Sequence, residues 1–466
     1  MLLPDLRKQL DEKKISSFEL TKLYLDKIKK ADNILNSYIT VDYEGAVKKA
    51  NDIQALIDSG SCSPMTGIPI SIKDNICTEG LKTTCASKML DSFIPPYNAT
   101  VVKKLNNAVI LGKTNMDEFG MGSDSSTSHF GTVKNPYNIT RVSGGSSGGA
   151  AAAVAAGLCP AAIGTDTGGS IRQPASFCGV TGLVPTYGTV SRYGLIAFAS
   201  SLDRIGIIAR SAEDTDFVLD CIAGHDERDM TSHSTAFRTV PKTIKGQRIA
   251  VIKELMNSSC AHIEKAAKFY KECGAELVEI SVPSFKLATS AYYIIASAEA
   301  ASNLARYDGV RYTHRAENCK SFDELIIKSR TEGFGDEVKR RILFGNFILS
   351  GDNYSAYFKK AQQARNKICD DYKKIFETCD TIIAPTTPSG AYPFDMEITP
   401  TQKYHSDYCT VSSSLAGLPA ITTTCAYDED NMPLGMTLIA KPHDEKRIIF
   451  LCSEFEKQFN RQEADI

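Results

Sequence analysis

The sequence predicts an α/β fold, in which strands and helices follow one another along the whole chain. Segments with the two-residue period of strands are interspersed with segments of helical spacing. Neither an internal repeat nor a low-complexity linker divides the 466 residues, so we expect one large domain over residues 1–466. A hydrophobic content of 42% and a charged content of 23% are ordinary for a globular protein with a sizeable core.

The first 60 residues are expected to be helical. Ser16 and Glu19 have the spacing of a capping box, and apolar residues follow at roughly helical intervals. A second helix is expected over residues 44–57, and Gly60 would end it because glycine readily takes the left-handed conformation. Neither helix carries residues that indicate chemistry.

The residues that indicate chemistry lie in a core region at about 65–210. Apolar residues at 68, 70 and 72 alternate with other residues, which predicts a strand. A helix before Asn107 and a strand over 108–112 would complete a β-α-β unit. The many glycines that follow alternate with small apolar residues, so we expect tight turns and close backbone packing there.

The remaining elements continue the α/β pattern to the end of the chain. A capped helix is expected to begin at Ser211, and the region at about 283–377 is expected to be mostly helical. The C-terminal region at about 380–460 is expected to hold strands and a helix. The individual strands are predicted at 248–252, 381–385, 420–424 and 435–439, and the final helix at 445–459.

Composition excludes several classes of protein. Lys and Arg number 53 against 55 Asp and Glu, and a net charge of −2 argues against a chain that binds nucleic acid through a strong overall field. No apolar run approaches the roughly 18 residues of a membrane-spanning helix, and the start becomes polar too soon for a signal peptide. The 14 cysteines are scattered without a C-x-x-C pair, so we expect free thiols, no metal site and a cytoplasmic location.

Two familiar motifs match the glycine-rich region poorly. Residues 144–148 fit the nucleophile elbow of α/β-hydrolases, but that motif should follow a strand, and residues 138–143 are a weak strand at best. Residues 112–114 resemble the end of a phosphate-binding loop, but Asn107 stands where that loop requires glycine.

A catalytic lysine with serines fits better. A serine hydroxyl needs an adjacent base, and the polar segments 70–74, 143–150 and 164–172 contain no histidine, which leaves Lys73. An ordinary lysine has a pKa of about 10.4, so Lys73 must be buried to act as a base near pH 7. The isoleucines at 70, 72 and 76 agree with such burial. A second serine would carry the proton from the nucleophile to the lysine.

The sequence Gly168-Gly169-Ser170 supplies the other requirement, an oxyanion hole. Two glycines before a nucleophilic serine let consecutive backbone N–H groups point at the reacting carbonyl without side-chain obstruction.

In combination, order and spacing, these segments resemble the amidase signature family: Lys73, then 144–149, then 168–172, continued by 173–188. The resemblance implies a single large domain with a mixed β-sheet core covered by helices on both faces. It implies a catalytic lysine base, a bridging serine with a cis peptide bond, and a serine nucleophile. These are Lys73, Ser146 and Ser170, and the oxyanion hole falls on the backbone of Thr167, Gly168, Gly169 and Ser170.

Within that family, further segments resemble the glutamine-hydrolysing subunits of tRNA-dependent amidotransferases. The resemblance implies that Ser170 attacks glutamine and that ammonia passes to a partner subunit, which amidates Glu-tRNA(Gln) or Asp-tRNA(Asn) with ATP and Mg. It implies two partner subunits, B and C, contact with tRNA mainly through the partner, and no cofactor bound by this chain. The segments are 114–119, 190–195, 197–203, 332–341 and 415–419.

The same resemblance implies a pocket for a free amino acid. Arg341 would bind the α-carboxylate, Asp407 the α-ammonium, and Tyr292 would line the pocket. Taken alone, Arg341 would be a surface cation of a basic run and Asp407 a helix cap. The loop 125–128 departs from the family pattern, and it is a candidate contact for glutamine or for the ammonia exit. The alternative function is a stand-alone amidase acting on another small amide.

Overall fold

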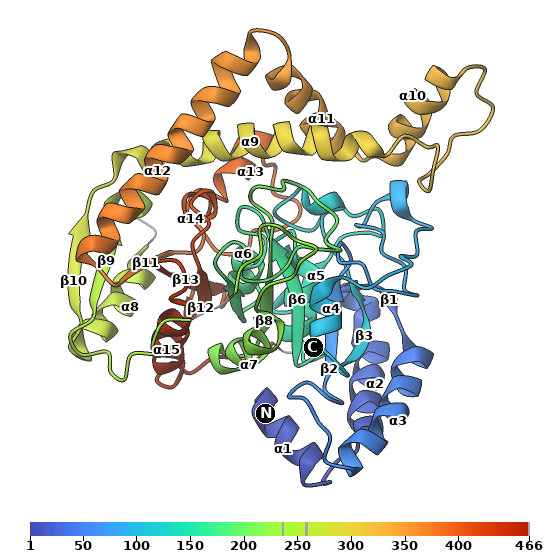
Figure 1. The fold of residues 1–466 in the computed structure, drawn as a ribbon. Helices are drawn as coiled ribbons and strands as arrows, with labels where there is room; N and C mark the ends of the chain where they lie inside the picture. Colours follow the sequence, from blue (N-terminus) through green and yellow to red (C-terminus); the bar gives the residue numbers. More distant parts are fainter. Residues whose placement is uncertain (235–236, 257–259, 465–466) are drawn as a thin grey trace.

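A single large mixed sheet forms the centre of the computed structural model, which describes residues 1–234, 237–256 and 260–464 (Figure 1). Its eleven strands follow the order β1-β3-β2-β6-β8-β7-β12-β13-β11-β9-β10. The strands are β1 (Tyr38–Val41), β2 (Pro69–Lys73), β3 (Val109–Thr114), β6 (Ala161–Asp166), β7 (Thr181–Val184), β8 (Arg204–Ala209), β9 (Arg248–Ile252), β10 (Glu276–Ile280), β11 (Thr381–Pro385), β12 (Ala420–Tyr427) and β13 (Pro433–Ala440). The predicted α/β class with a mixed sheet is confirmed.

Strand direction explains where the chemistry-bearing residues meet. Strands β3, β2 and β6 run parallel, with Ser71 opposite Ala162 and Ile72 opposite Ile163. Every residue of β2 and β6 is buried, as expected for parallel strands covered on both faces. The carboxyl ends of β2 and β6 therefore lie side by side, deep inside the molecule.

Helices cover both faces of the sheet. The Cβ that a side chain at Gly435 would carry points at Ser176 of α6, whereas Thr423 donates a hydrogen bond to Glu456 of α15. Because Thr424 pairs with Gly435 and neighbouring residues of a strand point to opposite faces, α6 and α15 lie on opposite sides of β12. The helices of this part are α1 (Leu3–Asp11), α2 (Ser17–Leu35), α3 (Tyr43–Asp58), α4 (Thr100–Lys104), α5 (Gly148–Ala155), α6 (Arg172–Phe177), α7 (Ala212–Ile222), α8 (Ala261–Glu272) and α15 (Glu445–Glu456).

A helical region crosses one end of the sheet, where α9 packs against α11 and α12 (Figure 1). Its apolar core, which includes Ile295, Val338 and Ile368, is continuous with buried residues of the sheet such as Ile252 and Ile382. This region carries Tyr292 and Arg341 toward the centre of the molecule. Its helices are α9 (Ala288–Asn303), α10 (Phe322–Gly333), α11 (Asp336–Leu349) and α12 (Lys359–Thr378), followed by α13 (Pro400–His405) and α14 (Val411–Leu415) near the same end.

Most of the predicted elements form, with small shifts at their ends. Ser16 and Glu19 make the expected reciprocal capping box, and Ser211 caps α7. The helix predicted over 44–57 spans one residue more at each end, and the final helix stops three residues before the predicted end at 459. None of the helices in the described ranges is both long and apolar enough to cross a membrane.

One prediction is corrected and another is confirmed. The first 60 residues are not wholly helical, because β1 adds an edge strand to the main sheet next to β3. Residues 138–143, expected to be a weak strand at best, contain the short strand β5 (Asn138–Val142), whose pairing is irregular, as that expectation implies. That strand pairs with β4 (Lys134–Asn135) in a separate two-stranded sheet. The turn at residues 144–148 therefore lacks the main-sheet strand that a nucleophile elbow requires.

Candidate active site

Lys73 is the last residue of β2, and its side chain is fully buried. Its Nζ lies 2.8 Å from Ser146 Oγ and 2.8 Å from Ser147 Oγ. The carbonyl oxygen of Thr165, near the end of the adjacent strand β6, lies 3.4 Å from the same nitrogen. The parallel pairing of β2 and β6 thus brings the amine beside the loop that follows β6.

Burial lowers the pKa of Lys73 to about 7, against the opposing effect of the carboxylates of Asp117, Asp166 and Asp203. In water the ammonium form would dominate at this pH, but a buried amine without a close anionic partner loses the solvation that stabilises the charge. About half of the molecules therefore carry an uncharged amine at pH 7, which is the form that can accept a proton.

Ser146 and Ser147 lie in the turn between β5 and α5. The Gly145–Ser146 peptide bond is cis, as the family resemblance implied. The N–H of Ser147 donates to the carbonyl oxygen of Ser170 at 3.0 Å, which fixes the serine turn against the loop after β6. Within the described residues, no hydrogen bond joins the hydroxyl of Ser146 to that of Ser170. The structure therefore links Lys73 to Ser146 directly and to Ser170 through the neighbouring backbone.

The loop at Thr167–Ser170 has unpaired backbone N–H groups and no room for side chains at its two glycines. A side chain at Gly168 would place its Cβ 2.5 Å from Tyr292 Cζ, and one at Gly169 would place it 2.4 Å from Thr410 Oγ1, so close packing requires both glycines. The N–H groups of residues 167–170 donate to no other residue that the structure describes. Such unpaired, neighbouring donors are the arrangement that an oxyanion hole needs.

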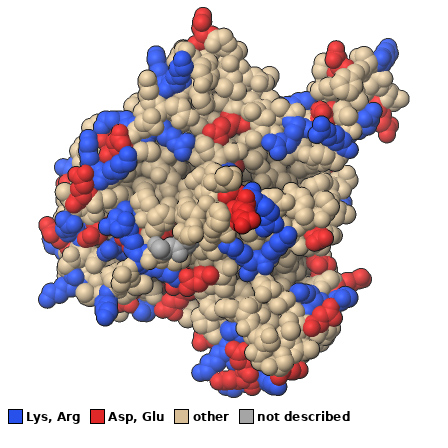
Figure 2. Space-filling view, viewed as in Figure 1, with Lys and Arg blue, Asp and Glu red and all other residues tan. Residues whose placement is uncertain are grey.

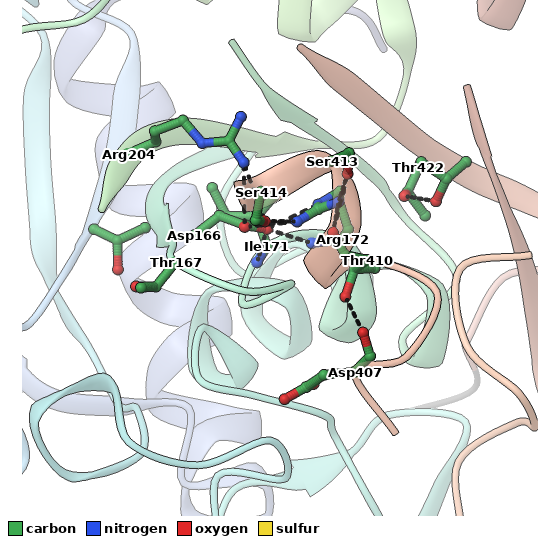
Figure 3. A network of polar contacts seen from close by, with 12 residues as sticks. Asp166, Thr167, Ile171, Arg172, Arg204, Asp407, Thr410, Ser413, Ser414 and Thr422 are labelled. Carbon is green, nitrogen blue, oxygen red and sulfur yellow. Dashed lines mark hydrogen bonds and ion pairs between the residues drawn. The ribbon is translucent and has the colours of Figure 1, made fainter. Parts of the chain in front are cut away.

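A buried ionic network anchors this loop (Figure 3). Arg172 Nη2 lies 2.9 Å from Asp166 Oδ1, and the N–H of Ile171 donates to Asp166 Oδ2. The other terminal nitrogen of Arg172, Nη1, donates to the carbonyl oxygen of Thr410 at 3.0 Å and to Ser413 Oγ at 2.9 Å. Because breaking a buried ion pair is costly, this network fixes the loop 167–170 relative to the start of α14.

Arg341 on α11 is buried, with 5% of its surface exposed, so it is not the surface cation that its basic run suggests in isolation. Its Nε donates to Glu337 Oε1 at 2.7 Å, and its guanidinium lies over the rings of Tyr293 and Tyr404. Nη1 and Nη2 donate to no other residue in the described ranges. Two parallel donors therefore remain for a carboxylate.

Asp407 lies between α13 and α14. Its Oδ2 accepts a hydrogen bond from the Tyr293 hydroxyl at 2.6 Å, and no described residue donates to its Oδ1. Its side chain does not cap α14, because only its backbone carbonyl accepts from Thr410 and Val411. Burial raises the pKa of Asp407 to about 6, although the bond from Tyr293 and the charge of Arg341 favour the ionised form.

Two further residues singled out by sequence have clear places. Tyr292 packs its ring against Gly168, beside the free donors of the loop. Ser125, in the loop 125–128, donates to the carbonyl oxygen of Gly144 at 2.9 Å and accepts from the N–H of Gly148 at 3.2 Å. That serine thus braces the turn that carries Ser146.

A cavity of about 260 Å³ opens beside Arg341 and touches the loop 125–128 through Thr127. Neither Ser146 nor Ser170 lines it. Its lining residues are Gly122, Ser123, Thr127, Glu337, Arg340, Arg341, Ile398, Lys403 and Tyr404.

Sequence reasoning missed three residues of this site. Ser147 is the second serine bound by Lys73, and only its place beside Ser146 hinted at a role. Tyr293 and Glu337 contact the predicted substrate residues, but they carry no motif of their own. No disulfide joins the cysteines of the described ranges, and no three His, Cys, Asp or Glu side chains there are grouped to hold a metal.

Known proteins resemble the chain over nearly its whole length. The family model for amidases matches residues 19–449. The glutamyl-tRNA(Gln) amidotransferase A subunit of Ruminiclostridium cellulolyticum is 49% identical, covering 99% of this chain and 97% of that protein. The crystal structure of the glutamyl-tRNA(Gln) amidotransferase A subunit from Thermotoga maritima is 36% identical, with a TM-score of 0.79, covering 99% of this chain and 98% of the other.

A peptide amidase from Stenotrophomonas maltophilia superposes with a TM-score of 0.84 at 27% identity, covering 100% of this chain and 98% of the other. The shared fold therefore extends beyond the amidotransferase subunits, whereas the higher sequence identity lies with them. Together, the family match and these relatives show that the chain belongs to the amidase family.

Proposed function

We propose that this chain is the glutamine-hydrolysing subunit of a tRNA-dependent amidotransferase. Relatives that are 47–49% identical over 97–99% of the chain carry the name of the glutamyl-tRNA(Gln) amidotransferase A subunit. The observation that carries the proposal is a pair of buried charged groups. Arg341 keeps two N–H donors, Nη1 and Nη2, and Asp407 keeps one carboxylate oxygen, Oδ1, that no described residue binds.

In the proposed mechanism, uncharged Lys73 is the general base. It accepts a proton from Ser146, which takes one from Ser170, and the Ser170 oxygen attacks the side-chain amide carbon of glutamine. The 2.8 Å contact of Lys73 with Ser146 supports the first transfer. The second transfer needs a rotation of a serine hydroxyl toward its neighbour, because no hydrogen bond joins the two hydroxyls within the described residues. Catalytic hydrogen bonds often become short and well aligned only in the complex with substrate.

The tetrahedral intermediate places its negative oxygen on the free N–H groups of residues 167–170. Each such donor contributes roughly 3–4 kcal/mol to transition-state stabilisation in comparable sites. The protonated Lys73 then returns its proton through Ser146 to the departing nitrogen, and ammonia leaves. Water, activated by the same base, hydrolyses the glutamyl ester on Ser170 and restores the free serine.

Glutamine recognition follows from its two charged ends. The Nη1 and Nη2 donors of Arg341 suit its α-carboxylate, and Asp407 Oδ1 suits its α-ammonium. An apolar amide would leave Nη1 and Nη2 of Arg341 and Oδ1 of Asp407 without hydrogen-bond partners, at a cost in binding free energy. The charged pair thus favours glutamine over the alternative substrate, another small amide.

The ammonia would pass to partner subunits B and C, which would bind ATP and Mg and hold the misacylated tRNA, while this chain binds no cofactor. The charges of this chain support indirect contact with tRNA, since Lys and Arg are interspersed with Asp and Glu on the face shown in Figure 2 and the net charge is −2. The 14 cysteines, which are scattered without a C-x-x-C pair, support a cytoplasmic location.

A substrate panel tests the proposed function. The purified chain, alone and co-expressed with its partner subunits, is assayed for ammonia release from glutamine, asparagine and an aryl amide. We expect glutamine to be the preferred substrate, and turnover to respond to misacylated tRNA and ATP in the complex. Hydrolysis of the aryl amide with glutamine inert would instead support the stand-alone amidase.

A further inference from the structure

Tyr293 contacts both of the charged residues assigned above to glutamine. Its hydroxyl donates to Asp407 Oδ2 at 2.6 Å. Its ring lies under the guanidinium of Arg341, with 4.8 Å between Arg341 Cζ and the ring centroid. The ring of Tyr404 stacks on that of Tyr293 at 4.1 Å, and its hydroxyl donates to Glu337 Oε1. Among the residues that the structure describes, only Tyr293 both donates to the Asp407 carboxylate and packs its ring on Arg341.

The helix α9 explains how this position arises. Consecutive residues of a helix point about 100° apart, so Tyr292 and Tyr293 face different parts of the site. Tyr292 lies against Gly168 in the loop with free donors, and Tyr293 lies against the charged pair. Their rings meet edge to face at 5.0 Å. Two neighbouring aromatic rings thus connect the reaction loop to the residues that would bind the ends of the substrate.

We infer that Tyr293 is a positioning residue that sets specificity for an α-amino acid amide, by orienting the carboxylate of Asp407 toward the α-ammonium. The inference rests on the proposed function. With Oδ2 held by the tyrosine hydroxyl, the carboxylate cannot rotate freely, and Oδ1 remains directed to the substrate. A carboxylate already oriented binds an ammonium without losing further conformational freedom, so the hydroxyl contributes to substrate affinity more than to the chemical step.

A purely structural role for Tyr293 makes a different prediction. A ring that only fills space would affect folding, kcat and KM alike, and its hydroxyl would be dispensable to binding. The ring is well packed, with 8% of the residue exposed, but the hydroxyl bonds a carboxylate that has a free oxygen rather than a backbone group. Removal of the hydroxyl alone therefore separates the two roles.

The test is a double-mutant cycle for glutamine hydrolysis by the whole chain with its partners. Tyr293→Phe keeps the ring and removes the hydroxyl, and we expect KM for glutamine to rise on the order of tenfold, because a hydrogen bond to a charged group is lost, with kcat within about twofold. In an Asp407→Ala background the same change should alter KM by less than about twofold, since its target is gone.

Tyr270→Phe is the matched control, because Tyr270 is also buried but its hydroxyl donates to the backbone of Leu451. It should leave KM unchanged. An unchanged KM in Tyr293→Phe, or an equal KM increase with and without Asp407, would overturn the inference. A wild-type chain that fails to hydrolyse glutamine would instead overturn the proposed function.

Discussion

Replacement of Lys73 by methionine should abolish glutamine hydrolysis and, at neutral pH, make the protein more stable. Lys73 is fully buried and has a pKa of about 7, whereas an unfolded chain gives lysine a pKa of about 10.4. At pH 7 the unfolded chain holds a proton that the folded chain binds only half of the time. Keeping Lys73 uncharged therefore costs about 4 kcal/mol of unfolding free energy at pH 7.

Methionine has similar length and carries no charge, so it removes this cost. It also removes the two 2.8 Å hydrogen bonds to Ser146 and Ser147 and the longer one to Thr165, each worth about 1 kcal/mol. The net gain expected for Lys73→Met at pH 7 is about 1–2 kcal/mol. Lysines at catalytic positions commonly lower stability in this way.

The pH dependence gives the sharper test. Because the folded-state pKa lies below the unfolded-state value, the unfolded chain binds more protons between pH 7 and 10.4, and wild-type stability rises with pH across that window. The stability advantage of Lys73→Met should therefore shrink by about 3 kcal/mol between pH 7 and pH 10, and its sign should reverse. Urea unfolding of both proteins at pH 7, 8.5 and 10 measures the difference.

Lys113→Met is the matched control. Lys113 is equally buried, but it lies 3.7 Å from the buried carboxylate of Asp74. Its removal leaves that charge unpaired and should destabilise the protein by about 3–5 kcal/mol. A difference between Lys73→Met and wild type that is the same at every pH would refute the claim that Lys73 is a buried uncharged amine.

Four further outcomes are expected. Ser170→Ala should eliminate glutamine hydrolysis and leave the melting temperature within about 2 °C of wild type, because its hydroxyl bonds no described residue; residual turnover would assign the nucleophile elsewhere. Arg341→Lys should raise KM for glutamine at least tenfold with a smaller change in kcat, since lysine cannot offer two parallel donors; an unaltered KM would place the carboxylate elsewhere. In the wild type, kcat should fall as the pH drops through about 7, because Lys73 becomes protonated. KM should rise below about pH 6, because Asp407 becomes neutral. Profiles of kcat and KM that stay flat over pH 5–8 would contradict both assignments. The isolated chain should bind tRNA weakly in a filter-binding titration at physiological salt, and tight, salt-sensitive binding would oppose this.

The sequence predicts the fold class and most of its elements because their signals are local. The capping box at Ser16 and the alternation at 68–72 each specify an element within a few residues. The strand β1 was missed because it has only four residues, although Asn36, which ends α2 in the left-handed conformation, is a helix stop signal that precedes it. The weak strand signal at 138–143 is confirmed, because three of the five residues of β5 are polar and the strand pairs irregularly with a partner of two residues.

The site is predictable in its reactive segments but not in its supporting contacts. Lys73 could be selected because no histidine offers an alternative base, and its burial follows from the isoleucines beside it. The bond of Tyr293 to Asp407 spans 114 residues, and that of Lys73 to Ser147 spans 74. Contacts of this kind depend on how α9, β2 and the loops pack together, which no local pattern of residues encodes.

Trapping the covalent intermediate is the most direct test of the central claim, that Lys73, Ser146 and Ser170 together hydrolyse glutamine. The complex is mixed with glutamine, quenched in acid during turnover and digested for mass spectrometry, with Ser170→Ala and Lys73→Met treated in parallel. The account predicts a glutamyl ester on the peptide at Ser170 in the wild type and none in either variant. An ester on another residue, or glutamine turnover with no ester at all, would contradict it.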